Sequence, residues 1–174
     1  ALAAAYEAGF RSLAIVCMHA YRYPQHEQRV AQIAHAIGYT QISPSHEISP
    51  LMKLVSRGDT TVADAYLSPL LRRYIDSVAT QLPGTRVQFM QSNGGLAEAR
   101  SFSGKDAILS GPAGGVMGAI EAAREAGYNK IIGFDMGGTS TDVALYDGAL
   151  PQRFETLVAG VRLQAPMMNI HTVA

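Results

Sequence analysis

The stretch FDMGGTSTDVALYDG, residues 134–148, places small polar residues between two apolar segments. The apolar segments, Ile131–Phe134 and Val143–Tyr146, have the length and composition of buried strands. Asp135 ends the first segment, and Asp142 opens the second. The pattern predicts two adjacent antiparallel strands joined by a short polar turn.

The turn has a composition that suits a polyphosphate, and it consists of Gly137, Gly138, Thr139, Ser140 and Thr141. Glycines let main-chain N–H groups approach an anion, and hydroxyl groups add neutral donors. A carboxylate at the strand end, Asp135, can hold a magnesium ion directly or through its waters. The stretch matches neither G-x-x-x-x-G-K-[ST] nor a G-x-G-x-x-G that leads into a helix. A plain hairpin whose polar turn faces water is the other interpretation, and the residues alone leave both open.

The preceding segment, LSGPAGGVMGAIEAAREAGY at residues 109–128, predicts a helix. Pro112 stands near its start and Gly127 past its end. Gly114, Gly115 and Gly118 lie on nearly one face, although each interior glycine costs up to about 1 kcal/mol relative to alanine. These glycines indicate either close packing on a neighbouring element or a functional role, which would be a hinge contact or close approach of a ligand to the free N–H groups at the helix start.

The N-terminal part reads as strand, helix, strand. Leu13–Met18 is a continuous apolar run, as in a strand covered on both faces. Pro24 opens a helix that Gly38 closes, and Tyr39–Ser43 is the next strand, so the order predicts a parallel crossover unit. The buried stripe of this helix is expected to contain Val30, Ile33, Ala34 and Ile37.

The following region combines a predicted loop with a long helix. Ser43–Gly58 contains two prolines and is expected to be a surface connection. Thr61 and Asp64 resemble a capping box and predict the start of the helix, which Pro69 should kink. Its inward residues are expected to be Leu67, Leu71, Tyr74, Ile75 and Val78. After a Pro-Gly turn, Val87–Met90 predicts another strand.

Composition limits the class of protein. The 174 residues are 48% hydrophobic, which is enough to bury a core, and Lys+Arg and Asp+Glu are both 14. This balance predicts neither nucleic acid nor a membrane as a partner. The single cysteine, Cys17, excludes an internal disulfide and predicts a reducing, cytoplasmic location. The sequence begins inside an apparent helix and ends without a closing signal, so we expect a fragment of a longer protein.

Other candidate chemistry is weak. His26-Glu27 resembles the start of H-E-x-x-H, but Val30 stands where the second histidine is needed. The five histidines lack metal-ligand spacing, so solvated or structural roles are expected. Cys17 lies in the apolar strand and is expected to be an inert core residue.

The pattern D-x-G-G-T-x-T-D at Asp135–Asp142, preceded by SGPAGG at 110–115, resembles the hydantoinase/oxoprolinase family, the hydantoinase A-like proteins. This family belongs to the superfamily of actin, sugar kinases and heat-shock chaperones. The resemblance covers essentially the whole chain, through HAYRYPQHEQRV (19–30), TTVADAYLSP (60–69) and FMQSNGGL (89–96). ILSGPAGGV, IGFDMGGTSTDV and APMMNIHTVA are most similar to the ATP-dependent 5-oxoprolinases within the family.

The resemblance implies an α/β fold of the ribonuclease H-like, actin-like ATPase type, with mixed sheets flanked by helices. It implies an incomplete two-lobed fragment. Residues 1–128 would be part of the first lobe and would include a connecting helix at 113–126. Residues 129–174 would begin the second lobe with its phosphate-binding hairpin.

The resemblance also implies the cofactors ATP and Mg²⁺ and a set of site residues. Asp135 and Asp142 would be catalytic, with Asp135 facing the metal and Asp142 orienting the loop or a water. Gly137, Gly138, Thr139, Ser140 and Thr141 would wrap the β- and γ-phosphates. Further cofactor-binding residues would be Ser110, Gly111, Gly114, Gly115, Asn93 and Gly94.

The implied activity is the ATP-dependent opening of the lactam of 5-oxo-L-proline to L-glutamate, in glutathione metabolism. The alternatives are an N-methylhydantoinase or a ketone carboxylase subunit of the same family, or a non-catalytic ATP-binding module. The implied partners are a small cyclic amide and either further copies of the chain or a hydantoinase B-like domain or subunit. The sequence has only one acid-Gly-Gly-Thr hairpin, so the fragment alone is expected to be inactive.

Overall fold

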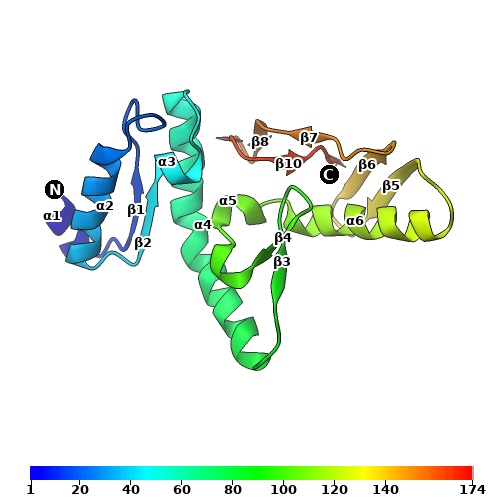
Figure 1. Ribbon diagram of the computed structural model, residues 1–174, viewed down its shortest axis with the longest axis horizontal. Coiled ribbons are helices and arrows are strands. Elements are labelled where there is room, and N and C mark those ends of the chain that lie inside the picture. Colours follow the sequence, from blue (N-terminus) through cyan, green and yellow to red (C-terminus); the bar gives the residue numbers. More distant parts are fainter. Residues whose placement is uncertain (174) are drawn as a thin grey trace. The chain divides into compact units, whose positions relative to one another are not determined.

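The computed structural model describes residues 1–173 (Figure 1). The chain forms two compact units. The first contains residues 1–85, 103–105 and 155–165, and the second contains residues 86–102, 106–154 and 166 onward. The predicted lobes refer to a longer protein, so their boundary stays a prediction. Within residues 1–173, every helix is too short or too polar to cross a bilayer.

A two-stranded parallel sheet forms the centre of the first unit. β1 (Ser12–Ile15) pairs with β2 (Gln41–Pro44), and α2 (Gln25–Ile37) makes the crossover between them. The helices α2 and α4 (Leu54–Gln81) contact the sheet from its two sides (Figure 1). α2 ends at Gly38, whose φ of 112° is left-handed. The predicted crossover unit is confirmed. The unit also contains α1 (Leu2–Glu7), α3 (Ser45–Ile48), β8 (Thr156–Val158) and β9 (Val161–Leu163).

The predicted start of the long helix is wrong. α4 begins at Leu54, and Thr61 and Asp64 lie buried inside it. The Thr61 hydroxyl donates to the Arg57 carbonyl at 2.7 Å, and the Ser43 hydroxyl donates to Asp64 Oδ2 at 2.8 Å. Both side chains therefore find partners within the helix or beside it, and neither caps a helix end.

The prediction that residues 43–58 form a surface connection is confirmed only for the exposed residues 50–53, and β2, α3 and the start of α4 occupy much of the rest. Ser43, Ser45 and Arg57 have no exposed surface, because protein hydrogen bonds replace their contacts with water. Two predicted inward residues are exposed instead, Ile33 by 40% and Tyr74 by 60%. Ala34 and Ile75 are buried as predicted.

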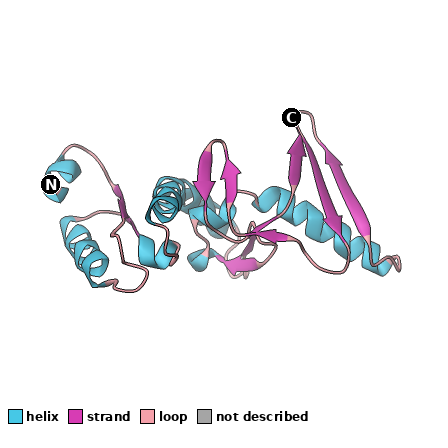
Figure 2. Ribbon diagram, turned by 90° about the horizontal axis from the view of Figure 1, so that it is seen from above, coloured by secondary structure: helices cyan, strands magenta, loops and turns pink. Residues whose placement is uncertain are grey.

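An antiparallel sheet of three strands and one helix form the main part of the second unit. The strand order is β11 (His171–Val173), β6 (Thr141–Tyr146), β5 (Ile131–Met136), and α6 (Ser110–Glu125) contacts β5 and β6. Figure 2 shows these strands in magenta near the C-terminus. The predicted antiparallel pairing of the two apolar segments is confirmed. The smaller elements are β3 (Gln88–Met90), β4 (Leu96–Glu98), η1 (Ala99–Ser101), α5 (Gly104–Ala107), β7 (Gln152–Arg153) and β10 (Met167–Met168).

The two faces of this sheet differ. Ala144 and Tyr146 are buried on the face toward α6, whereas Ile132 and Phe134 are 72% and 66% exposed on the other. Because side chains alternate along a strand, Asp135 and Asp142 share the face of the sheet that α6 covers.

Candidate functional site

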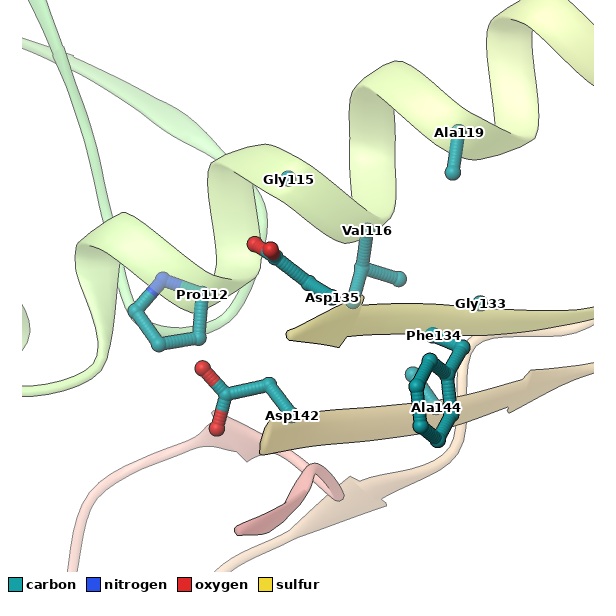
Figure 3. A pocket seen from close by; sticks show the side chains of 9 residues that line it. All are labelled: Pro112, Gly115, Val116, Ala119, Gly133, Phe134, Asp135, Asp142 and Ala144. Carbon is teal, nitrogen blue, oxygen red and sulfur yellow. The ribbon is translucent and has the colours of Figure 1, made fainter. Parts of the chain in front are cut away.

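Two carboxylates stand together at one end of the sheet. Asp135 on β5 lies directly opposite Asp142 on β6 in the strand register. Directly opposed residues of an antiparallel pair project to the same side, with Cβ atoms about 5 Å apart. Both carboxylates border a pocket of about 180 Å³ between the sheet and α6 (Figure 3). Its lining residues are Pro112, Gly115, Val116, Ala119, Gly133, Phe134, Asp135, Asp142 and Ala144.

Within residues 1–173, neither carboxylate has a positive partner. Neither makes an ion pair there, and the one side-chain hydrogen bond to either carboxylate comes from Thr172. Like charges directly opposite each other destabilise a sheet. A bound cation would remove that repulsion, so the pair favours a cation site.

The two carboxylates suit magnesium better than a metal ion whose ligands all come from protein side chains. The described residues contain no cluster of three or more His, Cys, Asp or Glu side chains placed to hold an ion. Magnesium binds proteins through one or two carboxylates and completes its octahedron with waters and substrate phosphates. Asp135 and Asp142 together supply that number of groups.

The start of α6 faces the carboxylates. The Asp135 carboxylate points toward the helix beside Gly115, and the Asp142 carboxylate lies near Pro112 (Figure 3). A Cβ atom on Gly115 would stand 3.7 Å from Asp135 Oδ2. Glycine here leaves the space beside that oxygen open. The first turn of α6 lies nearby, where Pro112 has no N–H and the Ala113 N–H donates to the Leu109 carbonyl at 3.0 Å.

The β5–β6 turn leaves space for a ligand, but it offers fewer free backbone N–H donors than the sequence predicts. The Gly137 N–H donates to the Ser140 carbonyl at 2.9 Å, so the turn itself uses that donor. Neither Gly137 nor Gly138 has a left-handed φ, and a Cβ on Gly138 would meet nothing within 4 Å. The chain's own geometry therefore does not require glycine at 138. The open space at Gly138 is compatible with the close approach of a ligand.

The other predicted glycines of α6 lie on the same helix but do not line this pocket. A Cβ on Gly114 would stand 3.7 Å from Met90 Cγ of β3, which supports the packing interpretation for that position. Gly111 and Gly118 have open space around them. Ser110 is the first residue of the helix.

Asn93 and Gly94 form the β3–β4 turn and do not line the pocket either. The Gly95 N–H donates to Asn93 Oδ1 at 2.7 Å, so the Asn93 side chain caps its own turn. Gly94 has φ +85°, and a Cβ there would clash with Met168 Cε and lie 3.3 Å from Met117 Sδ. The structure gives both residues a role in the turn and its packing.

Sequence reasoning missed two polar residues beside the site. Thr172 donates its hydroxyl hydrogen to Asp142 Oδ1 at 2.6 Å. Ser92 is 1% exposed, and its Oγ donates to the Asp106 carbonyl at 2.7 Å and accepts from the Leu109 N–H at 2.9 Å. Ser92 therefore fixes the residues from which α6 starts. Their signal in the sequence is faint, because each is a single hydroxyl residue in a strand or turn.

The first unit contains a second group of charged residues, built around Glu27. This carboxylate is fully buried and accepts hydrogen bonds from the Ser45 hydroxyl at 2.6 Å, the His46 N–H at 2.9 Å and the Cys17 N–H at 2.7 Å. His46 Nδ1 lies 2.7 Å from Glu27 Oε2. Burial alone would raise the pKa of Glu27, but these hydrogen bonds outweigh it and hold the pKa below its ordinary value.

Arg57 completes this group. Its guanidinium is fully buried and donates to Ser45 Oγ at 2.9 Å, to the Leu51 carbonyl at 2.5 Å and to the Cys17 carbonyl at 2.6 Å. Burial, and then the nearby Glu27 charge, raise the pKa of the Cys17 thiol. Every member of this group already has protein partners, which is the pattern of a structural network rather than of a ligand site.

Comparisons with known proteins agree over most of the chain. The profile described as hydantoinase/oxoprolinase matches residues 57–174, and that of the hydantoinase/oxoprolinase N-terminal region matches residues 1–38. The chain is 48% identical to 5-oxoprolinase from Saccharomyces cerevisiae over 97% of its length, which covers 14% of that protein.

Two solved structures share the fold. ATP-dependent caprolactamase from Pseudomonas jessenii superposes with a TM-score of 0.85 at 30% identity, over 97% of this chain and 26% of the other. Nucleotide-free acetone carboxylase, from a study of ATP-dependent acetone carboxylation, superposes with a TM-score of 0.80 at 27% identity, over 97% of this chain and 25% of the other. The predicted fold class is confirmed. The family profile matches about two thirds of the residues, and these relatives align with nearly the whole chain. The chain therefore belongs to the hydantoinase/oxoprolinase family.

Proposed function

We propose that the chain is part of an ATP-dependent 5-oxoprolinase, which opens the lactam of 5-oxo-L-proline to give L-glutamate. One observation carries the ATP-dependent part: two opposed carboxylates, which make no ion pair within residues 1–173, border a pocket at the start of a helix. The choice of 5-oxoproline rests on the 48% identity to the yeast 5-oxoprolinase. Because the chain spans 14% of that protein, the activity is proposed for a full-length protein that carries this sequence.

The proposal gives each residue of the site a task. Asp135 would hold Mg²⁺, and Asp142 would orient the turn or a water. Gly138 gives the phosphates room, and the hydroxyls of Thr139, Ser140 and Thr141 add donors. Asp135 has no competing hydrogen bond within residues 1–173, which supports its role as the metal-facing acid.

In the proposed reaction, the γ-phosphoryl group of ATP moves to the lactam oxygen and ADP leaves. Water then adds to the activated ring carbon, phosphate is released, and the ring C–N bond breaks as the nitrogen takes up a proton. The chain's own residues would bind and orient the phosphates, and a magnesium ion held by Asp135 would supply positive charge there. All residues named above are proposed to bind the nucleotide or its metal ion, and none is assigned to the lactam.

The pocket is too small for a whole nucleotide. Its volume of about 180 Å³ lies below the roughly 300–1,000 Å³ of ordinary small-molecule sites. We propose that it takes only the terminal phosphates and that the base binds elsewhere in the full-length protein. Residues 1–128 then belong to the first lobe, residues 129–174 begin the second, and the helix of residues 113–126 connects them. Gly114 serves as a close-packing position near the hinge. Ser110 and Gly111 at the start of the helix, with Asn93 and Gly94 in the β3–β4 turn, stay candidate cofactor-binding residues.

The family and the composition also support proposals for the cellular location, the pathway and the assembly. We propose a cytoplasmic enzyme of glutathione metabolism, since Cys17 is the single cysteine and suits a reducing compartment. A hydantoinase B-like domain or subunit, or further copies of the same chain, completes the assembly.

The test is a substrate panel on the full-length protein. We expect ADP release that depends on Mg²⁺ and on 5-oxoproline, with glutamate formed in equal amount. Release stimulated by hydantoins or by ketones with bicarbonate, and not by 5-oxoproline, would move the protein to another activity of the family. The panel must include ketones because the chain is structurally similar to acetone carboxylase. ADP release that needs no small molecule would favour a non-catalytic ATP-binding module.

The 174-residue chain by itself gives a second measurement. We expect no 5-oxoproline-dependent ATP hydrolysis from it and at most weak binding of magnesium-ATP, because a pocket for the terminal phosphates leaves most of the nucleotide in water. Calorimetric titration checks this. Micromolar binding would mean that the nucleotide site is more complete within this chain than proposed.

A further inference from the structure

Thr172 extends the carboxylate pair into a row of three residues. The register places Thr172 of β11 opposite Asp142 of β6, which in turn lies opposite Asp135 of β5. All three side chains therefore project to the same face of the sheet. The Thr172 hydroxyl donates to Asp142 Oδ1 at 2.6 Å, a length typical of a charge-assisted O–H···O⁻ bond.

This bond makes the two carboxylates unequal. Asp142 has one oxygen engaged, so rotation of its carboxylate would break a hydrogen bond, and Oδ2 keeps its lone pairs for another partner. Asp135 has no such restraint among residues 1–173. The pocket therefore combines one oriented carboxylate with one that is free to turn.

We propose that Thr172 is a positioning residue that fixes Asp142 for the magnesium-nucleotide complex. This inference rests on the proposed function, because it takes the pocket to be a magnesium and phosphate site. An oriented carboxylate meets the ion or its waters without first losing rotational freedom, so binding is tighter. Hydrogen bonds that orient metal-binding carboxylates typically contribute about 10–100-fold to metal affinity or activity.

A simpler role would be the attachment of β11. This strand has three residues, all exposed, and it lies at the edge of the sheet. The bond from Thr172 could serve only to hold that edge. The two roles differ in what the hydroxyl affects: a structural bond changes stability, whereas a positioning bond changes the affinity for magnesium-nucleotide.

The experiment uses the full-length protein and three substitutions in β11. Thr172→Val keeps the shape and removes the donor, and Thr172→Ser keeps the donor. Val173→Ala is the matched control, because Val173 is next in the strand, lies opposite Thr141 and projects to the other face. The measurements are the dissociation constant of magnesium-ADP by calorimetry, the thermal midpoint, and kcat and KM for ATP.

We expect Thr172→Val to weaken magnesium-ADP binding about ten-fold and to raise KM for ATP. Ten-fold is the lower end of the usual effect of such hydrogen bonds, and we expect it because the site is exposed. Thr172→Ser and Val173→Ala should bind within about two-fold of the wild-type protein, a difference near the usual scatter of such effects. Equal binding by wild type and Thr172→Val would overturn this inference alone, as would equal weakening by Val173→Ala. Failure of the wild-type protein to bind magnesium-ADP would overturn both this inference and the proposed function.

Discussion

Two groups of charged side chains in this chain have opposite surroundings. Glu27 and Arg57 in the first unit are completely buried, and hydrogen bonds from neighbouring residues satisfy both. Asp135 and Asp142 in the second unit lie opposite each other at the end of a sheet, and Thr172 is their one protein partner within residues 1–173. The Glu27–Arg57 group has its partners inside the protein, and the aspartate pair has no counter-charge among residues 1–173.

This difference in surroundings indicates that the first group contributes to folding stability and the second to ligand binding. A buried charge costs several kcal/mol unless protein groups replace its water, so its neighbours must be in place before folding is favourable. An incompletely paired carboxylate at a pocket keeps its capacity for a ligand. Substitutions in the first group should therefore change folding, and substitutions in the second should change ligand binding and catalysis.

The largest expected effect is the loss of catalysis in Asp135→Ala. Removal of the metal-facing carboxylate should reduce ATP hydrolysis by the full-length protein more than about a thousand-fold, equivalent to about 4 kcal/mol, with circular dichroism unchanged. The matched control is Asp147→Ala, because Asp147 is an exposed acid in the turn that follows β6. Near-normal turnover in Asp135→Ala would remove this residue from the site.

Arg57→Met should have the largest effect on folding. It leaves the Leu51 and Cys17 carbonyls and Ser45 without their buried donor, and loss of one partner from a buried charged network costs at least about 3 kcal/mol. Urea unfolding of the 174-residue chain, followed by circular dichroism, measures the change. Arg73→Ala, an exposed arginine on the same helix, is the control and should shift the midpoint little. Similar midpoints for both variants would contradict a structural role for the network.

The Glu27 carboxylate makes stability depend on pH. Because its folded-state pKa lies below its value in the unfolded chain, its contribution is fully present above the unfolded value and is lost as the pH falls through the folded one. Glu27→Gln should therefore be less stable at neutral pH and should lose less stability on acidification. The measurement is a series of urea midpoints between neutral and acidic pH. Parallel curves for the two proteins would show that Glu27 does not carry this dependence.

The sequence predicts the second unit better than the first for a physical reason. The hairpin of β5 and β6 and the helix α6 are marked by local signals: two apolar segments around a polar turn, Pro112 near a helix start and Gly127 past its end. The buried network joins Glu27, Ser45 and Arg57, which are far apart in the sequence. Each is an ordinary surface residue type, so the segment 43–58 reads as a loop until the fold brings its partners together. Thr172 is likewise recognised only from the strand register.

The smallest expected effect compares two glycines of α6, Gly115 and Gly118. Alanine is favoured over glycine in a helix interior by about 1 kcal/mol, and a Cβ on Gly118 would meet nothing within 4 Å. Gly118→Ala should therefore raise the thermal midpoint slightly and leave ATP hydrolysis by the full-length protein unchanged. Gly115→Ala gains the same helix propensity, but its methyl group stands 3.7 Å from Asp135 Oδ2, where the metal and its waters are proposed to lie. It should be as stable as Gly118→Ala and several-fold slower. If both variants keep full activity, the space beside Asp135 is not used by the ligand, and the position of the metal must be revised.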